Sequence, residues 1–149
     1  MATATTTAST RGQCLCGAIE FAVTGDPLSS VICHCTNCQK SSGSSFQANW
    51  FCKKDQFALV KGESAVSSYR DSATDAGSTI LRSFCSVCGS NLFTVNLDNP
   101  ALKDFIIVTS GCLDEQARKG FAPQREYYCK RRQAWVAPVE ASEKFEAMI

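Results

Sequence analysis

Seven of the ten cysteines in this chain fall into three closely spaced groups. The groups are a Cys-x-Cys, a Cys-x-Cys-x-x-Cys and a Cys-x-x-Cys: Cys14 and Cys16; Cys33, Cys35 and Cys38; and Cys85 and Cys88. Zinc takes tetrahedral thiolate or imidazole ligands, and cysteines this close on a tight turn can supply two of them. Gly17 and Gly89 follow the outer pairs, where a turn around a metal often needs a positive φ. The spacing therefore predicts zinc binding.

The number of thiolates predicts two zinc sites of different kinds. A structural site uses four protein ligands, and the outer pairs supply them: Cys14, Cys16, Cys85 and Cys88. Such a site ties distant parts of the chain together, so its metal contributes to folding. Cys33, Cys35 and Cys38 then remain, and three protein ligands with one open position are typical of a catalytic zinc. In another partition His34 is a fourth ligand, but three successive side chains do not easily converge on one ion.

A pair of structural zinc ions without any chemistry is the main alternative for the clustered cysteines. Buried inert thiols and disulfides fit less well, because the cysteines cluster closely and residues 1–11 lack the apolar stretch of a secretory signal. For the three isolated cysteines, Cys52, Cys112 and Cys129, we expect buried, inert thiols in strands.

Length and charge predict one ordinary domain without a bulk electrostatic partner. The chain has 149 residues and a formal net charge of +1, which argues against duplex nucleic acid and anionic membranes as partners. Its apolar runs are far shorter than the roughly 20 residues that cross a bilayer. We expect a disordered lead-in over residues 1–11, a zinc-binding domain over residues 12–149, and a cytoplasmic or nuclear location. Nothing in the sequence indicates an oligomeric state.

Short strands separated by turn residues predict a mainly β fold that positions these cysteines. Stretches rich in β-branched and aromatic residues are expected strands: residues 18–24, 45–51, 57–61, 64–70, 81–83, 91–97, 105–109 and 134–139. Helical signals are weak and limited to residues 36–42, 101–103 and 142–149. The expected architecture is a single domain of short antiparallel strands built around zinc, with few short helices.

The ordered motifs resemble a known protein family. They run Gly12-x-Cys14-x-Cys16-Gly17, then Cys33-His34-Cys35-x-x-Cys38-Gln39-Lys40-Ser41-Ser42-Gly43, then Phe84-Cys85-x-x-Cys88-Gly89-Ser90, with Gly111-Cys112-Leu113-Asp114 and Trp135 further on. This series resembles the glutathione-dependent formaldehyde-activating enzyme family, also called the centromere protein V family, over about residues 12 to 138. The resemblance implies a compact, mainly β fold of the Mss4-like superfamily.

The resemblance also implies a division of labour between the cysteines. It assigns a structural zinc to the outer four and a catalytic zinc to Cys33, Cys35 and Cys38. The implied activity is formation and cleavage of the carbon–sulfur bond of S-hydroxymethylglutathione, with glutathione or a similar thiol as co-substrate. The family often carries a histidine after a proline near the C-terminus, where this chain has Glu126.

A zinc ion with three thiolates and an open position suits thiohemiacetal chemistry. Such a centre can bind a substrate thiolate or polarise a carbonyl oxygen. Its net charge of about −1 makes it a poorer Lewis acid than a zinc held by three histidines. We therefore favour thiolate binding and exchange over water activation.

Residues around the central cysteines are candidates for substrate contacts. Lys40 and Ser41 follow the cluster and could meet a glutathione carboxylate, while Phe46 could line a pocket wall. A solvated lysine and a core aromatic residue are the alternatives. His34 could shuttle a proton, a role that histidine often takes.

Two hypotheses from different classes follow. The first is a zinc-dependent carbon–sulfur lyase that acts on a glutathione or other thiol adduct of an aldehyde. The alternative is a non-catalytic zinc module that binds a protein or other partner. Its main support is the basic run over residues 130–132, although such runs are more often solvated.

Overall fold

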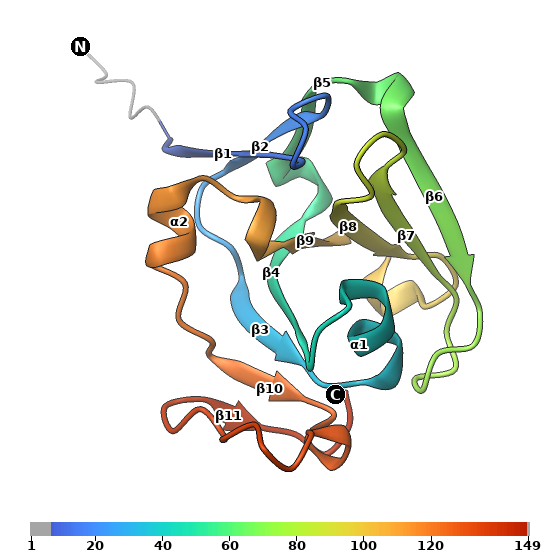
Figure 1. Cartoon of the computed structure of the whole chain (residues 1–149), viewed down its shortest axis with the longest axis vertical. Helices are drawn as coiled ribbons and strands as arrows, with labels where there is room; N and C mark the ends of the chain where they lie inside the picture. Colours follow the sequence, from blue (N-terminus) through green and yellow to red (C-terminus); the bar gives the residue numbers. More distant parts are fainter. Residues whose placement is uncertain (1–6, 149) are drawn as a thin grey trace.

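Two β-sheets make up most of the molecule (Figure 1). A computed structural model describes residues 7–148; residues 1–6 and 149 fall outside it. The smaller sheet has three strands in the order β1-β2-β5. These are β1 (Ser9–Gln13), β2 (Glu20–Thr24) and β5 (Phe57–Lys61). Both of its pairings are antiparallel.

The larger sheet has eight strands in the order β11-β10-β3-β4-β9-β8-β7-β6. In chain order they are β3 (Ser29–Cys33), β4 (Gln47–Lys53), β6 (Val66–Asp71), β7 (Ile80–Cys85), β8 (Asn91–Asn96), β9 (Phe105–Thr109), β10 (Arg125–Tyr127) and β11 (Glu143–Lys144). The pairings are antiparallel, except that β10 runs parallel to both β3 and β11. The prediction of a mainly β fold is confirmed.

Helices are short and lie in the connections. In the described part of the chain the two α-helices are α1 (Thr36–Ser42) and α2 (Glu115–Lys119). Single 3₁₀ turns are η1 (Lys54–Gln56), η2 (Glu63–Ala65), η3 (Pro100–Leu102), η4 (Ser110–Cys112) and η5 (Cys129–Arg131). Within residues 7–148, none of these helices is long and apolar enough to cross a membrane.

Several predicted elements need correction. Residues 134–139 form a turn and irregular backbone rather than a strand, because Pro138 cannot donate to a ladder and Trp135 is exposed. The C-terminal stretch contributes β11 instead of a helix, through its pairing with β10. Residues 9–11, assigned to the lead-in, belong to β1 because they pair with β2; the rest of that prediction lies largely outside the described residues. Of the three isolated cysteines, only Cys52 is buried in a strand; Cys112 and Cys129 lie half-buried in 3₁₀ turns.

The main core lies on one face of the larger sheet, where it meets residues of the smaller one. Phe21 and Val23 of β2 pack there with Ile106 and Val108 of β9, and all four are almost fully buried. Because side chains alternate along a strand, Phe105 and Ile107 of β9 point to the opposite face. That face carries the candidate site.

Candidate metal centres and the adjoining cavity

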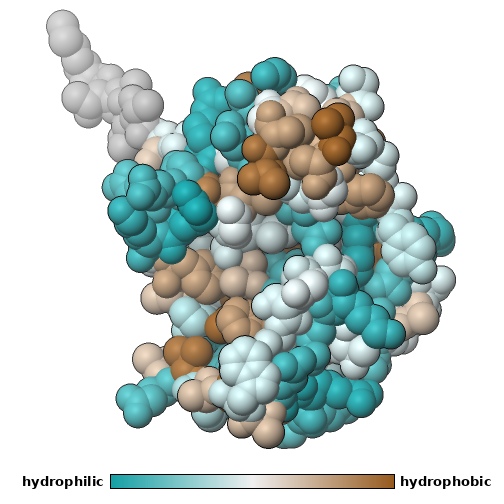
Figure 2. Space-filling model, in the orientation of Figure 1, coloured by the Kyte–Doolittle hydropathy of each residue, from teal (hydrophilic) through white to brown (hydrophobic). Residues whose placement is uncertain are grey.

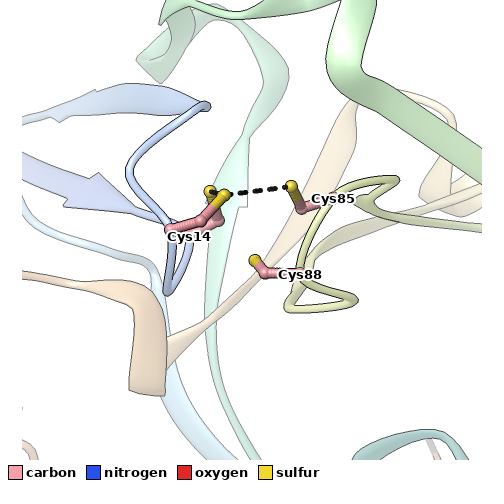
Figure 3. Close-up of side chains that lie close together, drawn as sticks. Cys14, Cys85 and Cys88 are labelled. Atoms are coloured by element: carbon pink, nitrogen blue, oxygen red, sulfur yellow. Dashed lines mark hydrogen bonds between the residues drawn. The ribbon is translucent and has the colours of Figure 1, made fainter.

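The outer four cysteines converge from two turns. Cys14 and Cys16 follow β1, Cys85 ends β7, and Cys88 lies in the turn after it. Figure 3 shows the side chains of Cys14, Cys85 and Cys88 directed toward a common centre. The four Sγ atoms all lie within 4.8 Å of one another. We call these residues the outer cluster.

The spacing of the outer cluster fits zinc. The Sγ of Cys16 lies 3.6 Å from that of Cys14 and 3.8 Å from that of Cys85. Four sulfurs at the usual zinc–sulfur distance of about 2.3 Å form a tetrahedron with edges of about 3.8 Å. These four residues could therefore hold one zinc ion and complete its coordination.

Local backbone geometry shapes the two turns of the outer cluster. Gly17 and Gly89 each have a φ of 75°, which favours glycine as predicted. The Gly89 amide donates to the Cys85 carbonyl at 2.8 Å and closes its turn. The amide of Ile19 donates to the Sγ of Cys14 at 3.3 Å. The turns thus direct N–H groups at sulfur, which favours the thiolate form that a metal requires.

The three central cysteines gather where β3 meets α1. Cys33 ends β3, Cys35 is the N-cap of α1, and Cys38 lies in its first turn. Their Sγ atoms all lie within 4.8 Å of one another, and the Cys38 amide donates to the Sγ of Cys35 at 3.3 Å. We call these residues the central cluster. Three thiolates could hold zinc and leave one position open.

His34 does not join the central cluster. Its ring is fully buried, and its Nε2 lies 3.0 Å from the Oε1 of Glu126. The partition in which His34 is a fourth ligand is therefore not the one that the structure assembles. His34 also does not line the cavity described next, so nothing places it for proton transfer to a substrate there.

The central cluster borders a cavity of about 110 Å³. Cys33, Cys35 and Cys38 form part of its wall, and the floor is one face of the larger sheet. Strand register aligns a row of floor residues across four strands: Phe51, Ile107, Thr94 and Arg82. The same sheet thus buries the core on one face and builds the cavity on the other.

Arg82 carries a positive charge into this cavity. Its Nε donates to the Oδ2 of Asp71 at 2.9 Å, and its Nη1 donates to the Oγ of Ser41 at 3.3 Å. Asp71 also accepts from the amide of Asn37. Burial alone would raise the pKa of Asp71, but these hydrogen bonds and the charge of Arg82 outweigh it and lower the pKa. Asp71 is therefore ionised and holds the guanidinium in place.

The guanidinium also influences the thiols. A hydrogen bond from Cys33, a second from Cys38 and the nearby positive charge of Arg82 lower the pKa of Cys35 to about 3, although burial opposes them. The same contact between thiols raises the pKa of Cys33. The cluster therefore favours a thiolate at Cys35, and Arg82 offsets part of its negative charge.

Comparison with known proteins identifies the family. A family model described as glutathione-dependent formaldehyde-activating enzyme matches residues 9–131. The chain belongs to this family. A crystal structure of a protein from Rhodobacter sphaeroides is similar in fold, with a TM-score of 0.55 and 18% identity over 70% of this chain and 88% of that one. The mainly β fold agrees with the Mss4-like superfamily. No curated protein matched the chain.

Glu126, the position at which the resemblance led us to look for a histidine, forms a buried anchor. Its carboxylate accepts from His34, from the Ser142 hydroxyl at 2.7 Å and from the Val139 amide at 3.1 Å. Burial would raise the pKa of Glu126, but these hydrogen bonds outweigh it and lower the pKa. Glu126 therefore ties the C-terminal segment to the loop of the central cluster.

The predicted substrate contacts of this family member do not line the cavity. Lys40 is exposed, and Phe46 packs against the ring of His34 with centroids 5.9 Å apart. Ser41 donates to the Oε1 of Gln47 at 3.1 Å and contacts Arg82, so it supports the wall from behind. None of these three residues is among those that line the cavity.

Sequence reasoning missed the cavity residues that come from distant strands. Arg82 and Ile107 carry no motif, and only their register across the sheet brings them beside the central cluster. Asn37 lies between two of the cluster's cysteines and could have been found by its position. The alternation of side chains along predicted strands could also have indicated the cavity residues, but using it requires knowing which strands pair.

Proposed function

We propose that this protein is a zinc-dependent carbon–sulfur lyase that makes and breaks a thiol–aldehyde adduct of the S-hydroxymethylglutathione type. One observation carries the proposal: the central cluster has three thiols rather than four, and it borders a cavity. Cys33, Cys35 and Cys38 would hold the metal. A zinc ion bound there supplies a thiol-acidifying and carbonyl-polarising centre with one open position.

The reaction needs no oxidant or reductant. In cleavage, the hydroxyl of the adduct loses its proton, the carbon–oxygen double bond forms, and the carbon–sulfur bond breaks. The sulfur leaves with the electron pair as a thiolate. In the reverse direction the thiolate attacks the carbonyl carbon and the oxygen takes a proton. Both directions place negative charge on the substrate oxygen or sulfur, so the protein must stabilise an anion.

Arg82 is suited to stabilise that anion. A guanidinium has five N–H donors, and its contacts with Asp71 and Ser41 use two of them. Its side chain is only 11% exposed, so solvent screens its charge less than at the surface. Because Asp71 fixes its position, Arg82 would not need to reorganise during the reaction. The cavity wall meanwhile holds thiol and aldehyde together, which supplies much of the rate.

A non-catalytic zinc module is the second candidate. The basic run at residues 130–132 gave its main support, but Arg131 pairs with Asp75 and Arg132 with Glu126, both at 3.4 Å. The observation that still favours it is the exposure of Leu15 and Val87 at the tips of the outer-cluster turns. Figure 2 shows apolar surface in the region of the molecule where these turns lie in Figure 1. A binding partner could contact such a surface.

Metal analysis combined with turnover tests the lyase proposal. We expect purified protein to carry close to two zinc ions and to equilibrate glutathione and formaldehyde with their adduct faster than the uncatalysed rate. Cys35→Ser should lose one zinc ion and this activity while keeping its circular dichroism spectrum. Cys129→Ser, which changes a thiol outside both clusters, is the matched control. A zinc-loaded protein that accelerates no thiol–aldehyde adduct would leave the binding module as the better account.

A further inference from the structure

The cavity beside the central cluster has mainly apolar walls. Aliphatic and aromatic side chains from five elements line it: Val31, Phe51, Ile80, Leu102, Phe105 and Ile107. Binding is favourable when an apolar group replaces water against walls of this kind. The cavity walls therefore favour an apolar part of the substrate, a preference that the cysteines alone do not determine.

Most polar side chains of the cavity already have partners within the described part of the protein, although the hydroxyls of Thr94 and Tyr128 do not. The amide of Gln47 donates to the Oδ1 of Asn49 at 2.8 Å. The amide of Asn96 donates to the hydroxyl of Ser78 at 2.8 Å. A polar substituent on a substrate would lose its hydrogen bonds to water and find few free groups to replace them.

The charged side chains of the cavity are paired as well. Arg82 is held by Asp71, and Asp75 pairs with Arg131. Among the residues that line the cavity, all within the described part of the chain, Arg82 is the only cationic one. Glutathione carries two carboxylates, whereas the cavity offers one cation, Arg82, which is already paired with Asp71. The cavity therefore lacks the charges to bind both carboxylates. The charged part of such a thiol would lie outside, leaving the cavity to another part of the adduct.

The size of the cavity indicates what that part is. Its volume is about 110 Å³, somewhat below the roughly 150 Å³ of a dry cavity that binds benzene. The hydroxymethyl group derived from formaldehyde would fill only a small share of it. A substituent of roughly four carbons would fill most of it.

We propose that this cavity binds a short alkyl substituent on the adduct, so that the preferred substrate is the thiol adduct of an apolar aldehyde larger than formaldehyde. The inference rests on the proposed lyase function and specifies its substrate class. The reaction is unchanged: the carbon–sulfur bond breaks, the sulfur leaves as a thiolate, and the carbonyl that forms carries the alkyl group. The alkyl group stays against Phe51 and Ile107 while Arg82 faces the oxygen.

Binding of unreactive analogues tests the inference without relying on turnover. S-butylglutathione is the butanal adduct without its hydroxyl, and S-methylglutathione is the matching analogue for formaldehyde. Each methylene that leaves water contributes about fourfold in affinity, so we expect the butyl compound to bind zinc-loaded protein at least about tenfold more tightly by calorimetry. The same pair built on 2-mercaptoethanol removes the charged part of the thiol. Equal affinities within both pairs, or no saturable binding of either butyl compound, would overturn the proposal.

Turnover distinguishes an alkyl group on the aldehyde carbon from an alkyl group on the thiol sulfur. We expect butanal with glutathione to exceed formaldehyde with glutathione in kcat/KM by about tenfold, with glyceraldehyde as a polar control of similar size. Preference for formaldehyde with butanethiol over butanal with glutathione would place the alkyl group on sulfur and overturn the proposed aldehyde. Formaldehyde with glutathione as the best pair would refute the substrate class while leaving the lyase function standing. Failure of every pair would instead refute the lyase function.

A pair of variants connects the preference to this cavity. Ile107→Phe adds volume to the wall and should lower the ratio of butanal to formaldehyde kcat/KM about tenfold. Leu102→Gln, in the 3₁₀ turn η3, replaces an apolar wall residue with a polar one and adds no bulk to the core. It should lower the same ratio, and it provides the test if Ile107→Phe does not fold. Val60→Phe enlarges an exposed side chain of β5 and is the control. An unchanged ratio in folded Ile107→Phe and Leu102→Gln would show that the substituent binds elsewhere.

Discussion

The two cysteine clusters use similar ligands in different settings. The outer cluster joins two turns that are far apart in the sequence and brings four sulfurs together beside the main core. The central cluster lies within six consecutive residues, from Cys33 to Cys38, and brings three sulfurs together at a cavity. A four-thiolate centre has no position left, and its metal stabilises the fold. We infer that distance along the chain and ligand number together distinguish the proposed structural centre from the proposed reactive one.

The largest expected effect is loss of the fold when the outer cluster loses a ligand. We predict that Cys88→Ser unfolds or becomes insoluble, because zinc binding at a structural site is coupled to folding. Cys35→Ser, the matched change in the central cluster, should keep a cooperative thermal transition. Circular dichroism and zinc content measure both. A soluble Cys88→Ser protein with the wild-type melting temperature would reverse the assignment of the two clusters.

The next largest effect is expected at Glu126, which anchors the loop of the central cluster. Glu126→Gln should cost about 3 kcal/mol in free energy of unfolding, because it leaves His34 and Arg132 without a buried charged partner. Urea denaturation measures this cost. Glu143→Gln, at an exposed position of β11, is the control and should stay within about 0.5 kcal/mol of wild type.

The difference in stability between wild type and Glu126→Gln is predicted to depend on pH. The pKa of Glu126 is lowered in the folded protein, so its contribution is present above the unfolded pKa of about 4.3. That contribution is lost as the pH falls through the lowered folded value. The difference between wild type and Glu126→Gln should therefore shrink below about pH 4. A difference that grows on acidification would show that the carboxylate is not stabilised by its partners.

The sequence was sufficient for local features and insufficient for those made by pairing. The thiol spacing predicted both clusters, and the bounds predicted for α1 and β9 are those observed. Propensity missed β3 and β10, whose places depend on pairing: β10 pairs in parallel with β3, and β3 pairs antiparallel with β4. Residue types near a motif also suggested Lys40 and Phe46 as substrate contacts, whereas the cavity wall comes from strands brought together by register.

Arg82 is a further point of comparison between the two cysteine clusters, because it places a cation at the cavity beside the central cluster. Arg82→Gln should reduce kcat/KM on the order of 100-fold, the usual cost of removing a donor to a developing anion. Arg82→Lys should recover part of this loss, since it keeps the charge but not the planar fork of donors. Arg70→Gln, at an exposed position of β6, is the control for charge alone. Equal kinetics for wild type and Arg82→Gln would assign Arg82 a purely structural role with Asp71.

The smallest predicted difference is between the rates at which the two clusters release zinc. A chelator can enter the open position that three protein ligands leave, whereas a four-thiolate centre must first lose a ligand. The expected difference comes from ligand number rather than burial, because Cys16 of the outer cluster is exposed, whereas Cys35 and Cys38 of the central cluster are buried beside the cavity. We expect two phases of zinc release to a colorimetric chelator, the faster one absent in Cys35→Ser. The fast phase should abolish turnover while the circular dichroism spectrum persists. Release of both ions in one phase that coincides with unfolding would mean that the central zinc is as closed as the outer one, and the lyase proposal would lose the open position on which it depends.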